Sequence, residues 1–200
     1  VLFNSDYTEG AHPKIMELMM SSNMEQTGGY GMDAYCDKAR ALIRQQCGRE
    51  DIDVQFLVGG TQTNLTVIAA TLRPHQGVIS ADTGHINVHE TGAVEATGHK
   101  VIALPSADGK LTAQQVLDCY HEHWNDATHE HIVQPGMVYI SNPTEIGSIY
   151  HRSELQALAA ACRECGLPLF MDGARLGYGL AAEDNDLDLP TITDCCDVFY

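Results

Sequence analysis

Apolar positions recur with a helical period in the first part of the chain. From Ala34 to Cys47 they return every three or four residues, and Gly48 follows, where a left-handed residue can end a helix. Residues 54–58 read VQFLV, a run that favours a short strand. After a glycine turn, a second periodic stretch extends to Leu72. The pattern predicts the order helix, strand, glycine turn and helix.

Later in the chain, short apolar runs alternate with helical patterns. Four runs predict strands, at residues 78–81, 101–104, 138–141 and 168–172. Residues 92–98 are compatible with a short helix. Two longer helices are expected to open with capping boxes, one made by Thr112 and Gln115 and the other by Ser153 and Gln156. Strands that alternate with helices indicate a three-layer α/β/α fold with a mostly parallel sheet.

Composition and charge narrow the class of protein. The 200 residues carry 11 basic and 27 acidic side chains, for a formal net charge of −16. Such a charge repels nucleic-acid phosphates and anionic membrane surfaces. No run is long enough for a membrane span, no signal-peptide pattern is visible, and the 7 cysteines lack the spacing of a disulfide framework. We therefore expect a cytoplasmic protein that binds neither nucleic acid nor membrane.

The segment 168–176 carries the most informative chemistry. Its apolar run ends at Asp172, and Arg175 follows three residues later. Ligands of open α/β sheets bind at the carboxyl ends of the strands, and a buried aspartate needs a donor or a cation beside it. Two interpretations stay open at this point. The pair forms a strand-end ion pair, or the carboxylate receives a protonated heterocyclic nitrogen of a ligand.

Two other loops are expected at the same edge of the sheet. Residues 59–64 read GGTQTN and open a helix, whose free N–H groups could hold a phosphate, the alternative being a plain glycine turn with a threonine cap. His85 follows a predicted strand and could stack on a flat ligand. His89 is close, but no third ligand of a zinc site follows. Glu90 is interpreted as an ordinary helix acid or as a residue that orients a neighbour.

Two further clusters are interpreted as non-catalytic, and no resident metal is expected. Histidines 121, 123, 129 and 131 lie in an acidic helix end and loop, where their spacing points the rings in different directions. They predict adventitious metal binding at most. Cys162 and Cys165 fall inside a helical pattern, which favours buried core cysteines over a redox or zinc site.

Five short motifs occur in a fixed order along the chain. They are Asn4-Ser5-Asp6, Tyr30-Gly31-x-Asp33, the run from Gly60 to Asn64, His85 with Glu90, and Met171-Asp172-Gly173-Ala174-Arg175. Together they resemble the low-specificity threonine aldolases, which are pyridoxal-phosphate enzymes of the β-eliminating lyase group with the aspartate-aminotransferase-like fold. The resemblance spans essentially all 200 residues. It implies retro-aldol cleavage of L-threonine or L-allo-threonine to glycine and acetaldehyde.

The resemblance also implies roles for the cofactor site. Gly60 and Thr61 would hold the phosphate of pyridoxal 5′-phosphate. His85 would stack on the pyridine ring and serve as, or position, the base that takes the substrate hydroxyl proton. Asp172 would pair with the pyridine nitrogen and keep it protonated, which makes the ring an electron sink.

Substrate and subunit contacts are implied in the same way. Ser5 and Arg175 would bind the carboxylate of a small amino-acid substrate, the arginine through a bidentate fork. Tyr30, Gly31 and Asp33 correspond to a family segment near the subunit interface, where the active site is shared. The resemblance therefore implies a homodimer or a homotetramer.

Two features depart from the family pattern. Residues 141–147 read SNPTEIG where better-known members carry a second active-site histidine, and Thr144 lies near its place. The lysine that binds the cofactor should follow a strand that residues 196–200 resemble, in a Gly-Gly-Thr-Lys-like turn. We expect residues 1–200 to comprise the N-terminal segment and most of the cofactor-binding large domain, with the lysine and a small C-terminal domain after Tyr200.

Two alternatives to a threonine aldolase stay open. One is a pyridoxal-phosphate lyase on the same fold that catalyses β-elimination or another amino-acid cleavage. The other is a noncatalytic ligand-binding module that keeps the pocket.

Overall fold

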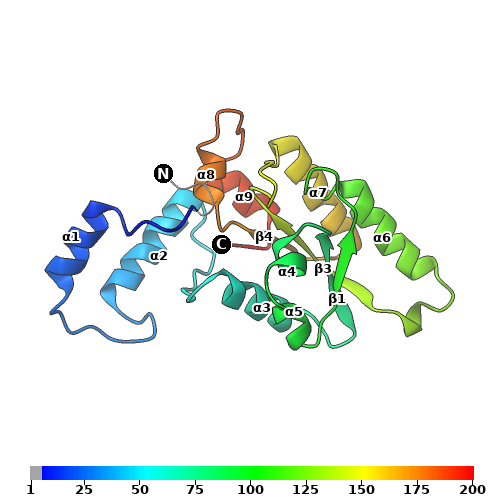
Figure 1. Cartoon of the computed structure of the whole chain (residues 1–200), viewed down its shortest axis with the longest axis horizontal. Helices are drawn as coiled ribbons and strands as arrows, with labels where there is room; N and C mark the ends of the chain where they lie inside the picture. Colours follow the sequence, from blue (N-terminus) through cyan, green and yellow to red (C-terminus); the bar gives the residue numbers. More distant parts are fainter. Residues whose placement is uncertain (1–5) are drawn as a thin grey trace. The chain divides into compact units, whose positions relative to one another are not determined.

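The computed structural model describes residues 6–200, in two compact units with their boundary between Leu42 and Ile43. The first unit holds helix α1 (Pro13–Ser22) and most of helix α2 (Ala34–Cys47) (Figure 1). Helix α1 was not expected from the sequence, but its proline suits a first helical position, where the N–H has no partner within the helix.

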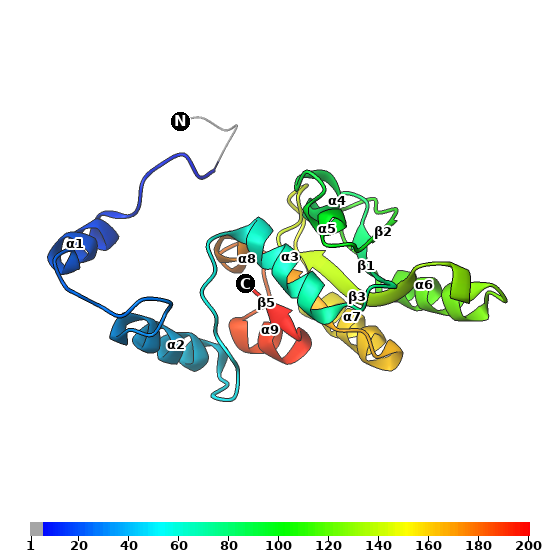
Figure 2. The same ribbon diagram turned by 90° about the horizontal axis from the view of Figure 1, so that it is seen from below.

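The second unit is built on a parallel sheet (Figures 1 and 2). Within the described residues its strands lie in the order β2 (Val101–Leu104), β1 (Gln76–Ala81), β3 (Gln134–Ser141), β4 (Leu169–Asp172) and β5 (Val198–Phe199). Every neighbouring pair is parallel. All the predicted strands from 78–81 onward are therefore confirmed, and their carboxyl ends share one edge of the sheet.

Helices cover both faces of this sheet (Figure 2). On one side are α3 (Gly60–Thr71), α4 (His85–Val88) and α5 (Ala93–Ala96), and on the other α6 (Ala113–Asn125), α7 (Arg152–Cys165) and α9 (Leu189–Cys195). Short helices α8 (Leu176–Leu180) and η1 (His129–His131) lie in the connections.

Consecutive residues of a strand pack into two separate hydrophobic cores. Val78 and Tyr139 are buried against the α3, α4 and α5 layer, whereas their neighbours Ile79 and Ile140 are buried against α6, α7 and α9. Extended strands place successive side chains on opposite faces, so both faces of a covered sheet must be apolar. The predicted three-layer α/β/α fold is confirmed.

The helix boundaries confirm most of the sequence patterns. Helix α2 ends at the predicted place, where Gly48 has a φ of 68°. Helix α6 opens with the predicted capping box of Thr112 and Gln115. The box predicted for Ser153 and Gln156 is wrong, because α7 begins two residues earlier and its box is formed by His151 and Glu154. The acidic side chain of Glu154 reaches back to the N–H of His151, which leaves Ser153 inside the first turn.

The strand predicted at residues 54–58 is also wrong, since the structure assigns no strand there. Strand propensity favours an extended backbone, but a strand requires a ladder with a neighbour.

None of the described helices is long and apolar enough to cross a membrane.

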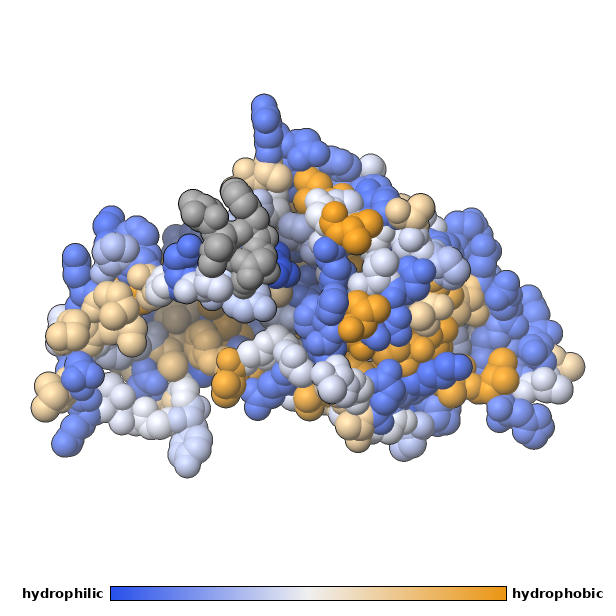
Figure 3. Space-filling model, in the orientation of Figure 1, coloured by the Kyte–Doolittle hydropathy of each residue, from blue (hydrophilic) through white to orange (hydrophobic). Residues whose placement is uncertain are grey.

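Hydrophilic residues predominate over α6 in Figure 3, and the exposed side chains of that helix include Asp118, His121 and Glu122.

Candidate active site

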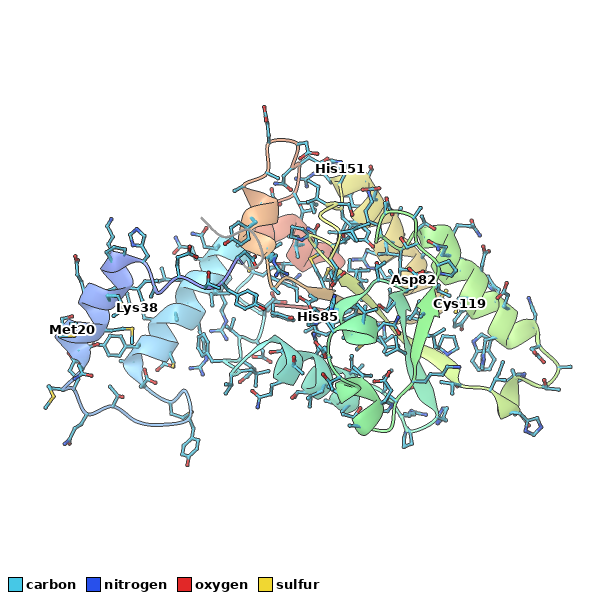
Figure 4. All side chains as sticks on the ribbon, viewed as in Figure 1. Met20, Lys38, Asp82, His85, Cys119 and His151 are labelled. Atoms are coloured by element: carbon cyan, nitrogen blue, oxygen red, sulfur yellow. The ribbon has the colours of Figure 1, made fainter. Side chains whose placement is uncertain are left out.

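Three strand ends and one helix start meet at the carboxyl edge of the sheet. Ser141 at the end of β3 lies opposite Asp172 at the end of β4. His85 follows β1 and begins α4 (Figure 4). Asn64 is a buried residue of the first turns of α3. This edge is where open α/β sheets bind ligands.

Asp172 is a buried carboxylate, only 4% exposed, that is held by neutral donors. The hydroxyl of Tyr139 donates to its Oδ2 over 2.5 Å, and the amide Nδ2 of Asn64 donates to the same oxygen over 3.1 Å. The backbone N–H of Ala174 donates to Oδ1 over 3.0 Å. Burial, and then the charge of Asp172, raise the pKa of Tyr139 well above its usual value. The tyrosine therefore stays a proton donor.

His85 is tied to two acidic side chains. Its Nδ1 lies 3.0 Å from Oε1 of Glu90, and its backbone N–H donates to Oε1 of Glu145 over 3.0 Å. The imidazole is partly exposed, while the side chain of Glu90 is fully buried. The hydrogen bond with Glu90 raises the pKa of His85 against the opposing effect of burial. The free edge of the ring therefore faces solvent or a ligand, and the other edge is fixed.

Asn64 joins these two groups. Its Nδ2 donates to Oε1 of Glu90 over 2.7 Å as well as to Asp172. Both hydrogens of one amide are thereby used on two buried carboxylates.

The N-terminus of α3 lies beside the same cluster. Gly59 precedes the helix with no side-chain cap, so the first-turn N–H groups of Gly60 and Thr61 are not closed off by a capping oxygen. A Cβ added at Gly60 would lie 2.9 Å from the hydroxyl of Tyr200, whose pKa is raised by burial and then by Asp172. Glycine at position 60 therefore lets the hydroxyl of Tyr200 approach the start of α3.

The chain is similar to known proteins in both sequence and structure. The family model of beta-eliminating lyases matches residues 3–200. The chain belongs to the beta-eliminating lyase family. It is 32% identical to a low-specificity L-threonine aldolase of Pseudomonas aeruginosa over 181 residues, which are 90% of this chain and 51% of that protein. A threonine aldolase of Saccharomyces cerevisiae, also of low specificity, is 26% identical over 164 residues, 79% of this chain and 41% of that one.

A solved structure extends the similarity. The threonine aldolase of Leishmania major is 49% identical and superposes with a TM-score of 0.94 over 98% of this chain and 56% of its own. The chain spans about half the length of its Pseudomonas relatives. The resemblance to threonine aldolases and the expected fold are thereby confirmed.

Of the two residues expected to bind the substrate carboxylate, the structure describes only Arg175. Ser5 lies outside the described residues. Arg175 is exposed at the start of α8, three residues beyond Asp172. The hydrogen bonds that satisfy Asp172 come from Tyr139, Asn64 and Ala174, so the strand-end ion pair is not needed to explain its burial.

The predicted interface residues Tyr30, Gly31 and Asp33 belong to the first unit. Tyr30 and Gly31 both have left-handed backbones, with φ of 61° and 72°. Asp33 accepts hydrogen bonds from the N–H groups of Tyr35 and Cys36 at the start of α2, and these bonds lower its pKa. These residues lead into the start of α2, and their place at a subunit interface stays a prediction.

The structure describes both clusters that were interpreted as non-catalytic. Within residues 6–200 no set of three or more histidine, cysteine or acidic residues is arranged to hold a metal ion. Cys162 and Cys165 are buried in α7, and burial raises the pKa of the Cys162 thiol to about 12.

Sequence reasoning gave no role to Tyr139, Asn64 or Glu145. Asn64 is the last residue of the glycine-turn motif at 59–64. Tyr139 lies two residues before the end of a predicted strand, so side-chain alternation could have placed Tyr139 on the same face of the sheet as Asp172. Glu145 stands in the segment that departs from the family pattern, where Thr144 bonds Ser148 and Glu145 reaches His85.

Proposed function

We propose that this chain forms the cofactor site of a pyridoxal-phosphate lyase that cleaves L-threonine or L-allo-threonine to glycine and acetaldehyde. One observation carries the proposal. A buried aspartate, Asp172, lies at the sheet edge between an uncapped helix start and a histidine that is anchored on its far side. The names of the relatives in Pseudomonas aeruginosa and Leishmania major support the same reaction.

The residues fit pyridoxal phosphate in each of its parts. An anionic phosphate suits the uncapped N–H groups of α3 at Gly60 and Thr61, where the helix dipole favours negative charge. A pyridinium N–H suits Asp172, whose buried carboxylate has only neutral donors around it in the described contacts. A flat ring suits the partly exposed face of His85. The donor set therefore matches an anionic, planar heterocycle that carries a basic nitrogen.

When bound, the cofactor supplies an electron sink for the carbanion left when the Cα–Cβ bond breaks. Asp172 would hold a proton on the ring nitrogen, since a buried carboxylate favours a cation beside it. His85 would stack on the ring, and its Nε2 would accept the proton of the substrate β-hydroxyl.

Other parts of the site belong to the proposal as well. Ser5 and Arg175 bind the substrate carboxylate. The lysine that holds the cofactor follows Tyr200, in the turn that the family places after this strand. The protein is a cytoplasmic homodimer or homotetramer, with Tyr30, Gly31 and Asp33 near the subunit interface.

The test is substrate profiling of the full-length protein with added cofactor. Acetaldehyde released in equal amounts with glycine from L-threonine or L-allo-threonine supports the proposal. Pyruvate and ammonia from an amino acid with a β-leaving group, with no acetaldehyde from either threonine, would replace it with β-elimination. Tight cofactor binding with no turnover of any of these amino acids would indicate a binding module.

A further inference from the structure

The amide of Asn64 is hydrogen bonded to two buried acids that lie far apart in the sequence. Asn64 is fully buried, and Glu90 and Asp172 are 5% and 4% exposed. One nitrogen, Nδ2, lies 2.7 Å from Oε1 of Glu90 and 3.1 Å from Oδ2 of Asp172. Only the NH2 end of an amide can face two carboxylates, because the carbonyl end would repel both. The amide orientation follows from this chemistry.

Glu90 has fewer hydrogen-bond partners than Asp172 in the described contacts. Its Oε1 is shared by Asn64 and by Nδ1 of His85, while its Oε2 is buried with no hydrogen-bond partner in the described part of the chain. Leaving a buried carboxylate oxygen unpaired is costly. A charge-assisted hydrogen bond from the imidazole is therefore the main compensation that Glu90 receives.

The surroundings of His85 fix which nitrogen carries a proton. Acidic groups approach it from its own segment (Glu90), from β4 (Asp172) and from the loop after β3 (Glu145), and the ring of His89 lies 5.6 Å away between centroids. Of these, Glu90 alone is hydrogen bonded to a ring nitrogen among the described contacts. A carboxylate accepts and cannot donate, so Nδ1 must carry hydrogen in the neutral ring.

We propose that Glu90 and Asn64 are positioning residues, which join His85 and Asp172 into one hydrogen-bonded unit and hold His85 as its Nδ1–H tautomer with Nε2 toward the substrate. This inference rests on the proposed function for the meaning of Nε2. The arrangement of Asn64, Glu90 and His85 themselves does not depend on which amino acid is cleaved.

The two buried acids would therefore have different partners. Asp172 would pair with the cofactor nitrogen, and Glu90 accepts the hydrogen bond of His85. Asn64 holds the two carboxylates at a fixed separation without giving up a proton. A glutamine at position 90 has the same shape, but its NH2 group can donate a hydrogen bond to Nδ1. The Nε2–H tautomer then becomes available, and in that tautomer Nε2 cannot accept the substrate proton.

The experiment is histidine ¹⁵N NMR of the full-length protein, in the wild type and in Glu90→Gln, with His85→Asn used to assign the resonance. The wild type should show the Nδ1–H tautomer at high pH. Glu90→Gln should lose that preference and titrate at lower pH, since the neighbouring charge is gone. Glu90→Asp keeps the charge and should restore part of both effects. Glu95→Gln, on the exposed side of α5, is the matched control and should change neither.

Kinetics give a second readout. The acid limb of the kcat/KM profile should move to lower pH in Glu90→Gln, and kcat should fall about tenfold or more, with KM changed less. An Nε2–H tautomer in the wild type, or an unchanged tautomer and titration in Glu90→Gln, would overturn the inference even if threonine is cleaved. The predicted spectra in a protein that cleaves no threonine would uphold the positioning unit and refute the proposed function instead. If Glu90→Gln fails to fold, the wild-type tautomer and the Glu90→Asp titration decide the matter.

Discussion

The hydroxyl of Tyr139 donates a 2.5 Å hydrogen bond to Oδ2 of Asp172, and both side chains are buried. The tyrosine lies on β3 two residues before the point opposite Asp172, so the two side chains project from neighbouring strands toward the same helical layer. A carboxylate in this position cannot be solvated, and it relies on this donor and on Asn64. Asp172 is therefore held in place by a residue of the neighbouring strand.

Replacing Tyr139 with phenylalanine should destabilise the fold by about 1–3 kcal/mol, because a buried carboxylate loses a donor. Urea unfolding at neutral pH measures the change. Tyr120→Phe, on α6 and partly buried, removes a hydroxyl remote from Asp172 and should cost less. Equal losses for both variants would show that the Tyr139 hydrogen bond contributes nothing specific.

Replacing Asp172 with asparagine should leave the fold nearly intact but lower kcat by about 100-fold or more, while cofactor affinity changes much less. The amide keeps the shape of the side chain and loses the charge that holds a proton on the ring nitrogen. Steady-state kinetics and cofactor titration separate the two effects. Asp118→Asn, exposed on α6, is the control. Unchanged turnover in Asp172→Asn would remove this role from the residue.

Glycines 59 and 60 offer a matched pair of substitutions. A Cβ at Gly60 would meet the Tyr200 hydroxyl at 2.9 Å, whereas one at Gly59 has nothing within 4 Å. Gly60→Ala should weaken cofactor phosphate binding by about 1 kcal/mol or more, since the added methyl meets the Tyr200 hydroxyl and one of the two groups must shift at the start of α3. Gly59→Ala should bind nearly as well as the wild type. The comparison is made by cofactor titration, and equal affinities for the two variants would place the phosphate elsewhere.

The raised pKa of His85 predicts a pH-dependent part of the stability. A cation that is favoured in the folded state stabilises the protein below the ordinary pKa of histidine, and this contribution is lost as the pH rises through the folded value. The difference in urea midpoint between the wild type and His85→Asn should therefore be larger at pH about 5 than at pH about 8. A difference that does not vary with pH would mean that Glu90 does not favour the charged imidazole.

Local patterns were enough to predict most of the fold and part of the site. An apolar run that ends in an acid placed Asp172 at a strand end, and a glycine turn before a helix placed Gly60 at the start of α3. Both inferences depend on neighbours in sequence, which is where periodicity and turn chemistry carry information.

The internal hydrogen bonds of the site could not be predicted in the same way. Asn64 is 26 residues from Glu90 and 108 residues from Asp172 along the chain. Their meeting depends on how α3 is rotated against the sheet, which is set by the packing of residues such as Ile68 in the core. The same limit explains the missing strand at 54–58, because propensity cannot supply a pairing partner.

The most direct test of the central claim is the intact mass of the purified full-length protein before and after borohydride reduction. A site that holds pyridoxal phosphate on a lysine should retain one cofactor per chain after reduction, and Asp172→Asn should retain it as well. A mass that is the same before and after reduction, in protein purified and reduced with excess cofactor, would contradict the account.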